Sequence, residues 1–275
     1  MNITFTEALI LGAVQGLTEF LPVSSSAHLV FFQNIFGLKE PILFFDICLH
    51  LGTLLAVVLF LKDDLKAIIL ELLKLFNPKT GMSFKQRWIL LNYARFALLA
   101  VIATVPTALI GFLFKDQFES LFSSVPAVGS MLIVTGIILY LTKIFKNAQK
   151  EIDGISILDA FIIGCAQGLS IAPGISRSGT TISFGIFRGI QQDVAARFSF
   201  LLSIPAILGA AVMKFDAHLS LNAGLLPYFG GTVMAGITGY LSLILLSSMI
   251  RKGHLSYFSP YCIFAGFLAL ASALF

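Results

Sequence analysis

Charged residues are scarce in this chain of 275 residues. Asp, Glu, Lys and Arg together make up 12% of it, whereas soluble domains carry about 25% charged residues. Hydrophobic residues make up 57%, and apolar stretches recur from end to end, so that no soluble domain fits between them. This composition excludes an ordinary soluble fold and predicts a protein whose main solvent is the lipid bilayer.

Signatures of several other protein classes are also missing. Cys48, Cys165 and Cys262 lie far apart in apolar runs without a CxxC pair, so we interpret them as small buried hydrophobes and not as metal or redox ligands. No Walker A or HExxH pattern occurs. Residues 1–7 carry no basic residue, so no cleavable signal peptide is expected. The net charge of +4 requires no nucleic-acid partner, because basic residues of membrane proteins gather in cytoplasmic loops.

Six apolar stretches approach or exceed the length needed to cross about 30 Å of hydrocarbon. They lie at about 42–61, 96–114, 125–142, 198–213, 226–250 and 256–275. Two further apolar segments, about 8–36 and 156–187, are interrupted at 22–26 and 173–178 by breaks that contain Pro and Ser. The sequence therefore predicts an all-α polytopic membrane protein with six transmembrane helices and two broken segments, each made of two half-helices.

The charged segment 63–93 has an apolar stretch that Glu71 and Lys74 interrupt. Two interpretations stay open for it: an amphipathic helix at the membrane interface, or a solvated loop.

The distribution of Lys and Arg indicates how the broken segments are arranged. If each is a hairpin that enters and leaves on one side, fourteen basic residues fall on one face and three on the other, with Arg177 left inside the second hairpin. Cytoplasmic loops are rich in Lys and Arg, so the first face is predicted to be cytoplasmic and both termini extracytoplasmic. If these segments crossed the membrane completely, the difference in Lys and Arg between the two faces would be smaller. The distribution therefore favours re-entrant hairpins.

The two broken segments also resemble one another. With a shift of 152 residues, residues 15–17 and 167–169 both read Gln-Gly-Leu, and the Ser-containing breaks at 24–26 and 176–178 coincide. Chance similarity between apolar helices is the alternative. Because the hairpins enter from opposite faces, we predict an inverted-topology repeat, about 1–142 and 152–275, within one integral membrane domain, 1–275. Irregular backbone at the midplane must line a polar cavity or be buried, so the two tips should line such a cavity.

Two ionisable residues lie inside these apolar segments. A charge at the centre of a membrane helix costs about 2.5 to 3.5 kcal/mol on insertion scales, so Glu19 and Arg177 should face a common polar cavity. A purely structural ion pair that locks the two tips is the alternative interpretation.

The residues around these charges indicate phosphate chemistry. The string PGISRSGTT, residues 173–181, combines a helix start, several hydroxyls and a guanidinium, which together can bind phosphate. Ser24, Ser25, Ser26 and His28 lie within ten residues of Glu19, and a serine needs a base such as His to attack phosphorus. A histidine that only completes the core is the alternative for His28.

These motifs resemble those of a known family. The string QGLTEFLPVSSSAH, residues 15–28, is similar to an (E/Q)xxxE motif with its Ser-rich break and His, and residues 173–181 are similar to a PGxSRSxxT motif. Both belong to the bacterial undecaprenyl-diphosphate phosphatases, also called bacitracin-resistance proteins, and the resemblance covers essentially the whole chain. It implies hydrolysis of undecaprenyl diphosphate to the monophosphate, which recycles the lipid carrier of cell-wall synthesis and gives bacitracin resistance.

The resemblance further implies a multi-pass protein of the bacterial plasma membrane, with a pocket open to the extracytoplasmic side and a divalent metal, Mg²⁺ or Ca²⁺. The implied partners are the polyprenyl diphosphate substrate and membrane lipid, and the oligomeric state is left open, with a homodimer as one option. A lipid-phosphate flippase or anion carrier is the leading alternative class. The combination of serine, histidine and acid favours an enzyme, because a carrier needs no nucleophile.

Roles for the matching residues follow from their charge. Arg177 is expected to hold the substrate phosphates, together with the hydroxyls of Ser24, Ser176, Ser178 and Thr181. Glu19 is expected to hold the metal, with Gln15 next to it. Some family members carry Glu at the position of Gln15; because this residue is neutral here, the sequence does not support an account that needs two carboxylates on the metal.

Ser25 is the candidate nucleophile and His28 its base, while attack by His28 itself or by a metal-bound water remains an alternative. Asp46 and His50 stand four residues apart on one face of the span 42–61. One interpretation is that they contact Glu19 or His28 and orient that side chain. The other is that they form a helix-terminal pair at the outer interface.

Overall fold

The computed structural model describes residues 3–38, 43–77, 83–122, 124–145, 148–214 and 225–272. This part of the chain is all helical and contains no β-strand, only one isolated bridge between Lys150 and Ile190. The α-helices are α1 Phe5–Phe20, α2 Ser25–Ile35, α3 Leu43–Phe60, α4 Lys62–Leu75, α5 Phe84–Leu90, α6 Asn92–Leu113, α7 Lys115–Phe122, α8 Val125–Leu141, α9 Ile157–Leu169, α10 Arg177–Phe187, α11 Gln192–Lys214, α12 Leu225–Arg251 and α13 Ser259–Ser272. Short 3₁₀ helices are η2 Thr142–Ile144, η3 Ile152–Gly154 and η4 Leu255–Phe258.

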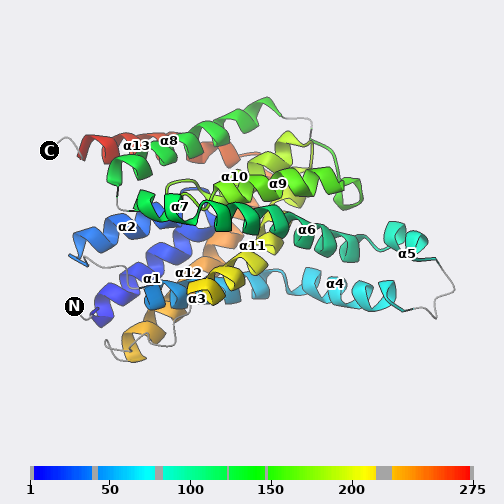
Figure 1. Cartoon of the computed structure of the whole chain (residues 1–275), viewed down its shortest axis with the longest axis horizontal. Helices are drawn as coiled ribbons and strands as arrows, with labels where there is room; N and C mark the ends of the chain where they lie inside the picture. The colour runs from blue at the N-terminus through cyan, green and yellow to red at the C-terminus, as the bar shows by residue number, and fades with distance from the viewer. Residues whose placement is uncertain are drawn as a thin grey trace.

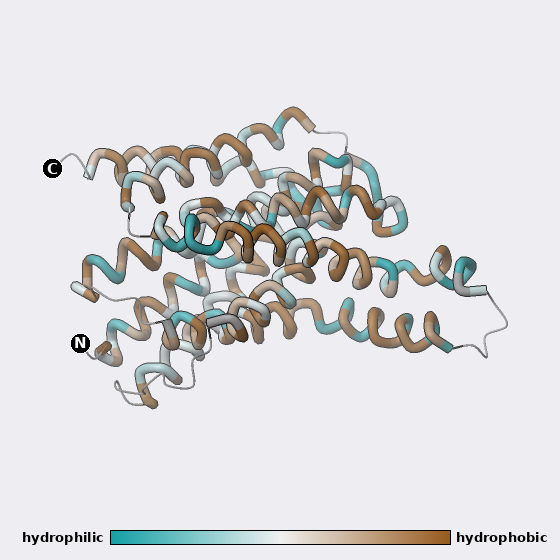
Figure 2. The backbone as a smooth tube through the Cα atoms, in the orientation of Figure 1, coloured by the Kyte–Doolittle hydropathy of each residue, from teal (hydrophilic) through white to brown (hydrophobic). Residues whose placement is uncertain are grey.

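Among the described residues, five helical segments are long and apolar enough to cross a membrane: α6, α8, α11, α12 and α13 with its preceding 3₁₀ turn. The bent pair α3 and α4, whose axes meet at 73°, makes a sixth if it counts as one span. Hydrophobic stretches run along most of these helices (Figure 2). The chain is therefore a multi-pass membrane protein, and each of the six predicted stretches is helical over most of its described length.

The two broken apolar segments each form two helices, α1 with α2 and α9 with α10, as the breaks predicted. Side-chain caps explain where α1 and α9 begin, because Thr4 with Glu7 and Ser156 with Asp159 form capping boxes that satisfy the first backbone N–H groups. Pro22 and Pro173 lie in the breaks, where a residue that lacks an N–H group cannot continue a helical hydrogen-bond ladder.

The charged segment 63–93 is also helical over most of its described part, as α4 and α5, so the interpretation as a solvated loop is wrong. Residues 78–82 lie outside the description. Glu71 on α4 accepts hydrogen bonds from the backbone N–H groups of Tyr93 and Ala94, at 2.7 and 3.1 Å. A carboxylate at these orphan donors stabilises the start of α6 and joins α4 to it.

Close helix packing holds each broken segment against a long membrane-spanning helix. Helix α1 packs along α12, and α9 packs along α6 (Figure 1). Both contacts depend on glycine: a Cβ at Gly12 would lie 2.3 Å from the Gly231 carbonyl oxygen, and one at Gly164 would lie 2.1 Å from that of Ala103. Small residues let helix backbones approach closely, which is a main source of packing energy within lipid.

The apolar core surrounds the ends of the broken segments. Phe20, Phe96, Phe198 and Phe200 are almost fully buried in one cluster. All three cysteines are free thiols, and Cys262 is buried, with its Sγ 3.3 Å from the Pro22 carbonyl oxygen. This contact joins α13 to the first break.

Candidate active site

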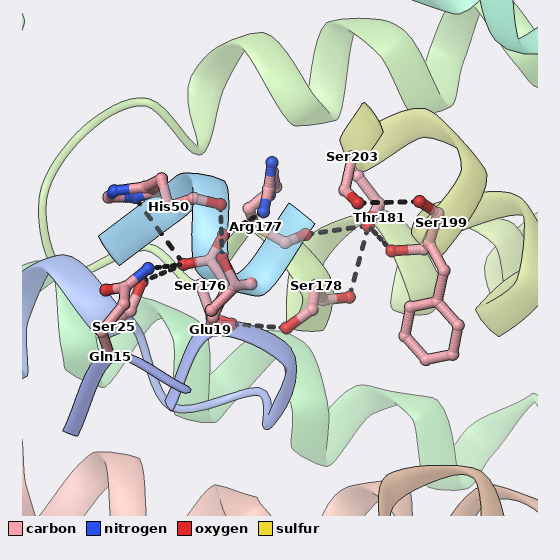
Figure 3. A network of polar contacts seen from close by, with 12 residues as sticks. Gln15, Glu19, Ser25, His50, Ser176, Arg177, Ser178, Thr181, Ser199 and Ser203 are labelled. Carbon is pink, nitrogen blue, oxygen red and sulfur yellow. Dashed lines mark hydrogen bonds and ion pairs between the residues drawn. The ribbon is translucent and has the colours of Figure 1, made fainter. Parts of the chain in front are cut away.

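The two helix breaks meet in the fold. A Cβ at Gly179 would lie 3.0 Å from the Cβ of Pro22, which places the start of α10 against the break between α1 and α2. An ion pair crosses the same junction, because the Arg177 Nη2 donates to Glu19 Oε1 (Figure 3). The two charges therefore lie together, which both interpretations of the sequence required; whether they form a catalytic site or a structural ion pair stays a matter for experiment.

Glu19 is the centre of this polar network. Its Oε2 accepts hydrogen bonds from Gln15 Nε2 at 2.9 Å and from Ser25 Oγ at 2.6 Å. The Glu19 side chain is 5% exposed, and that of Arg177 is 20% exposed. A carboxylate so far removed from water is stabilised only by such a shell of donors and an opposite charge.

The backbone of the first break directs Ser25 toward Glu19. Ser24 has φ 67°, a left-handed conformation that a non-glycine residue adopts at a cost of about 1 to 2 kcal/mol. The chain turns sharply there, and α2 begins at Ser25. The Ser24 hydroxyl lies 3.1 Å from that of Ser26 and does not cap α2, so the strained turn serves to place the Ser25 hydroxyl.

The second break presents a helix start with hydroxyl groups. Ser176 caps α10, since its Oγ accepts a hydrogen bond from the Gly179 N–H at 3.1 Å, and its Oγ lies 3.3 Å from that of Ser178. Thr135 on α8 holds the break, as its Oγ1 accepts from the Ser176 N–H at 3.0 Å and donates to the Gly174 carbonyl at 2.9 Å. The result is a fixed helix N-terminus with two hydroxyls and a guanidinium, a geometry that suits an anion.

His28 does not occupy the position that the sequence prediction gave it. Its Nδ1 lies 2.8 Å from the Ser24 carbonyl, which can only accept, so this nitrogen carries the hydrogen. Its Nε2 then accepts from the Tyr261 hydroxyl at 2.6 Å. Both ring nitrogens are thus engaged away from Ser25, whose hydroxyl donates to Glu19 instead.

Thr181 also faces away from the junction. Its hydroxyl donates to the Arg177 carbonyl at 2.8 Å and lies 2.6 Å from the Ser199 hydroxyl on α11. The network in Figure 3 continues in this direction to Ser203. In this structure Thr181 and Ser199 hold α10 against α11, and the Thr181 hydroxyl does not point at the junction.

Asp46 and His50, near the start of α3, contact different parts of the structure. Asp46 Oδ1 accepts from Gln33 Nε2 on α2 at 3.0 Å, and the Asp46 carbonyl lies 2.7 Å from His50 Nδ1. That contact makes Nδ1 the protonated nitrogen and leaves His50 Nε2 facing Glu19 Oε2 at 3.9 Å. His50 is therefore the residue of the pair that reaches the site. The spacing of Asp46 and His50 in an apolar span was the only sequence signal for it.

The side chains around Glu19 supply only part of the oxygen ligands that a hard cation needs. The described residues contain no group of three or more His, Cys, Asp or Glu side chains that could hold a metal. However, the Gln15 Oε1 is buried and has no hydrogen-bond partner among them, and it lies beside the single carboxylate. Mg²⁺ and Ca²⁺ take oxygen ligands, and Mg²⁺ commonly uses one or two carboxylates with substrate phosphates, so this set suits either ion once a diphosphate is present.

Comparison with known proteins gives a consistent result. The family model described as "Bacitracin resistance protein BacA" matches residues 8–268. Proteins called undecaprenyl-diphosphatase are similar over nearly the full length. That of Carboxydothermus hydrogenoformans is 47% identical over 260 residues, covering 93% of this chain and 92% of the relative. That of Desulforapulum autotrophicum is 43% identical over 266 residues, covering 96% of each chain. That of Methanobrevibacter smithii is 41% identical over 272 residues, covering 98% and 97%.

Proposed function

The chain belongs to the bacitracin resistance protein BacA family, and we propose that the site around Glu19 hydrolyses undecaprenyl diphosphate to undecaprenyl phosphate and inorganic phosphate. This reaction recycles the lipid carrier of cell-wall synthesis and accounts for resistance to bacitracin. The observation that supports the site most strongly is the buried Glu19 carboxylate, which contacts a serine hydroxyl of one break and the arginine of the other.

Arg177 is the proposed ligand of the substrate phosphates. Glu19 is the only hydrogen-bond partner of its guanidinium within the described residues, so most of its five N–H donors remain for a ligand. Ser176 and Ser178 would add hydroxyl donors from the same helix start. The two hydroxyls are held in place before substrate arrives, and preorganised donors of this kind supply much of the stabilisation in phosphoryl transfer.

Ser25 is the proposed nucleophile. Its Oγ would form a bond to the terminal phosphorus while the bond from that phosphorus to the bridging oxygen breaks, and undecaprenyl phosphate would leave. The hydroxyl proton would pass to Glu19, which already accepts the Ser25 hydrogen bond. Water would then hydrolyse the phosphoserine and release inorganic phosphate. His28 would support this arrangement through the Ser24 carbonyl instead of acting as the base.

A divalent cation, Mg²⁺ or Ca²⁺, is proposed to bind at Glu19 and the Gln15 Oε1. When bound, such an ion offsets negative charge on the phosphate oxygens. The guanidinium that pairs with Glu19 would turn to the diphosphate as the substrate enters, which leaves the carboxylate to the ion and to Ser25.

An inverted-topology repeat of two re-entrant hairpins is proposed as the framework of this site. One unit would contain α1–α2, α3, α6 and α8, and the other α9–α10, α11, α12 and α13, within a single membrane domain. The exchange of partners supports this arrangement, since the first hairpin packs on α12 of the second unit and the second hairpin packs on α6 of the first. In Figure 1, α1 and α2 lie at one end of the long axis, whereas α9 extends toward the other.

The orientation remains part of the proposal: a bacterial plasma membrane, with the site open to the extracytoplasmic face. Several residues behind this assignment, among them Lys39, Lys79, Lys146 and both chain ends, lie outside the described structure. Single-cysteine labelling in a background without Cys48, Cys165 and Cys262 tests the orientation. A membrane-impermeant maleimide applied to intact cells should modify E119C on α7 and spare K85C on α5. The opposite pattern would reverse the orientation.

Rapid-quench mass spectrometry on the purified protein tests the chemistry. With undecaprenyl diphosphate and Mg²⁺, the wild type should release phosphate and carry a transient phosphate on Ser25. A phosphate on His28 would exchange the two roles, and release of phosphate without an adduct would identify water as the attacking group. Binding of the lipid without any hydrolysis would identify a carrier and remove the enzyme assignment.

A further inference from the structure

A polar cavity lies where α3, α4, α11 and α12 meet, apart from the site around Glu19. It has a volume of about 290 Å³, at the lower end of the range for small-molecule pockets. We call it the interfacial cavity; its lining combines four apolar residues, five charged side chains and one serine: Phe60, Leu61, Ala196, Phe200, Asp63, Asp64, Asp193, Arg197, Arg251 and Ser247. It lies where α3 and α12 end and α11 begins, so it opens at the edge of the membrane-spanning helices.

An aromatic layer separates the interfacial cavity from the active site. The Phe200 ring packs edge-on against Phe20, with centroids 6.2 Å apart, and against Phe60 at 5.9 Å. Phe20 follows Glu19 in the chain and is 1% exposed. The cavity is therefore closed toward the active site, and a ligand would reach it from the membrane edge.

The charges in the cavity are not all balanced within the protein. Arg197 is engaged with Asp64 through two hydrogen bonds, one of them from Nε to Oδ2 at 2.9 Å, and with the Tyr93 hydroxyl at 3.2 Å. This pair forms one wall. Asp63, Asp193 and Arg251 remain, and none of them has an ion-pair partner within the described residues. The open cavity thus offers two carboxylates and one guanidinium.

Ser247 completes the cationic side of the cavity. Its Oγ accepts a hydrogen bond from Arg251 Nη1 at 3.0 Å, so its own hydroxyl hydrogen can point to a ligand oxygen. A guanidinium next to a hydroxyl suits a phosphodiester. The carboxylates of Asp63 and Asp193 suit a primary ammonium group, which has three N–H donors.

The surroundings of the cavity indicate a lipid ligand and not a soluble one. Leu59, next to the lining residue Phe60, is 51% exposed, and Ile244 and Leu245 on α12 are 47% and 51% exposed. Apolar side chains so exposed on membrane-spanning helices face hydrocarbon. A headgroup in the cavity could therefore lay its acyl chains along these helices.

We propose that the interfacial cavity binds the headgroup of an aminophospholipid, with its phosphodiester at Arg251 and Ser247 and its primary ammonium at Asp63 and Asp193. The excess of carboxylates disfavours lipids that carry only negative charge, including the diphosphate substrate. A quaternary ammonium group is disfavoured as well, because it has no N–H to donate to the carboxylates. This site is independent of the chemistry proposed around Glu19.

Native mass spectrometry of the purified full chain tests this assignment. Dioleoyl phosphatidylethanolamine, phosphatidylglycerol and phosphatidylcholine would be titrated separately, so that only the headgroup differs. We expect the ethanolamine lipid to bind at least about tenfold more tightly than the other two, which corresponds to about 1.4 kcal/mol. Equal affinities for the three lipids would overturn the proposal.

Substitutions locate the site. D193N, D63N and R251Q should each weaken binding of the ethanolamine lipid about tenfold. D116N on α7 and K252Q, which do not line the cavity, should leave it unchanged. Each variant should still hydrolyse undecaprenyl diphosphate in detergent, which shows that it is folded. D63N and R251Q are the variants least able to disturb folding, because Asp63 and Arg251 are exposed. Unchanged lipid affinity in D63N and R251Q would place the headgroup elsewhere.

Discussion

In the break between α1 and α2, the chain turns at Ser24, with φ 67°, and no side chain caps the helix that follows. In the break between α9 and α10, it turns at Gly174, with φ 97°, and Ser176 caps the following helix. Thr135 holds the second break on both sides, whereas the first is joined to its surroundings mainly through Glu19 and His28, residues that belong to the site. The second break is therefore stabilised by a side-chain cap, whereas the first combines a left-handed residue with the polar contacts of Glu19 and His28.

The two helix pairs also differ at their first residues, where α1 and α9 begin. Asp159, at the start of α9, is fully buried and accepts hydrogen bonds from Lys150 Nζ at 3.0 Å and from Arg188 Nε at 2.7 Å. At the start of α1, Glu7 and Thr4 form an exposed capping box. In the mechanism proposed above, the second pair would therefore serve as a fixed phosphate cradle, against which the first pair would present its nucleophile.

The largest expected effect contrasts serines of the two breaks. S25A should lower turnover by at least about 10³-fold, as expected when the nucleophile of a cooperating set is lost, while the diphosphate still binds. S176A removes a cap and one hydroxyl donor and should lose much less. Steady-state phosphate release, with substrate binding measured in parallel, checks this, and S26A is the matched control. Turnover by S25A close to that of S26A would move the nucleophile away from the first break.

A second substitution probes the cradle itself. R177K keeps the positive charge but replaces a planar fork by a point charge, so kcat/KM should fall by about 10²- to 10³-fold, the loss typical of one preorganised donor. R188K, which contacts Asp159 and not the site, provides the comparison. Near wild-type activity of folded R177K would show that charge without geometry is sufficient.

The turns of the two breaks should respond in opposite ways to substitution. G174A forces a side chain into a left-handed position, and its Cβ would lie 2.3 Å from the Val128 carbonyl oxygen, so the free energy of unfolding should fall by about 2 kcal/mol or more. S24G relieves strain and should leave stability equal or raise it by about 1 kcal/mol. Thermal unfolding in one detergent compares them. Destabilisation by S24G would mean that the Ser24 hydroxyl holds the first break after all.

The last prediction concerns the metal and is read from the metal titration. Turnover of E19Q should fall, because Gln cannot accept the Ser25 proton, and the Mg²⁺ concentration for half-maximal residual activity should rise by at least about tenfold, because the carboxylate at the site is lost. E7Q, at the exposed start of the same helix, should change neither. Since E19Q also leaves Arg177 without its partner, unfolding must be measured beside activity. An unchanged metal titration in E19Q would place the ion elsewhere.

Most of the architecture could be predicted from the chain alone. Apolar length indicated the spans, and Pro with Ser indicated both breaks, because these features act through local chemistry and the bilayer thickness. The buried charges Glu19 and Arg177 predicted their own proximity, since neither is tolerated alone in hydrocarbon. The sequence left open whether 63–93 is helix or loop; the structure shows a helix α4 whose Glu71 contacts the start of α6.

Side-chain partners were the part that the sequence could not supply. Gln15 and Gln167 occupy matching positions, yet one donates to Glu19 and the other to Thr107 at 3.2 Å. His28 stands three residues from Ser25 but bonds to Tyr261, which is 233 residues away, whereas His50 Nε2 lies 3.9 Å from Glu19 Oε2. Ser199 gave no signal at all before α11 was placed against α10.

The sequence by itself determined that this chain lies in a membrane, where its helices break, and which charges must meet, because hydrophobicity, proline and the cost of a buried charge act locally. Only the tertiary structure decided that Ser25 donates to Glu19, that Thr181 faces α11, and that a second set of charges gathers where α3, α11 and α12 meet. Those outcomes depend on rotamers and helix packing among residues far apart in the chain, and no local pattern encodes them.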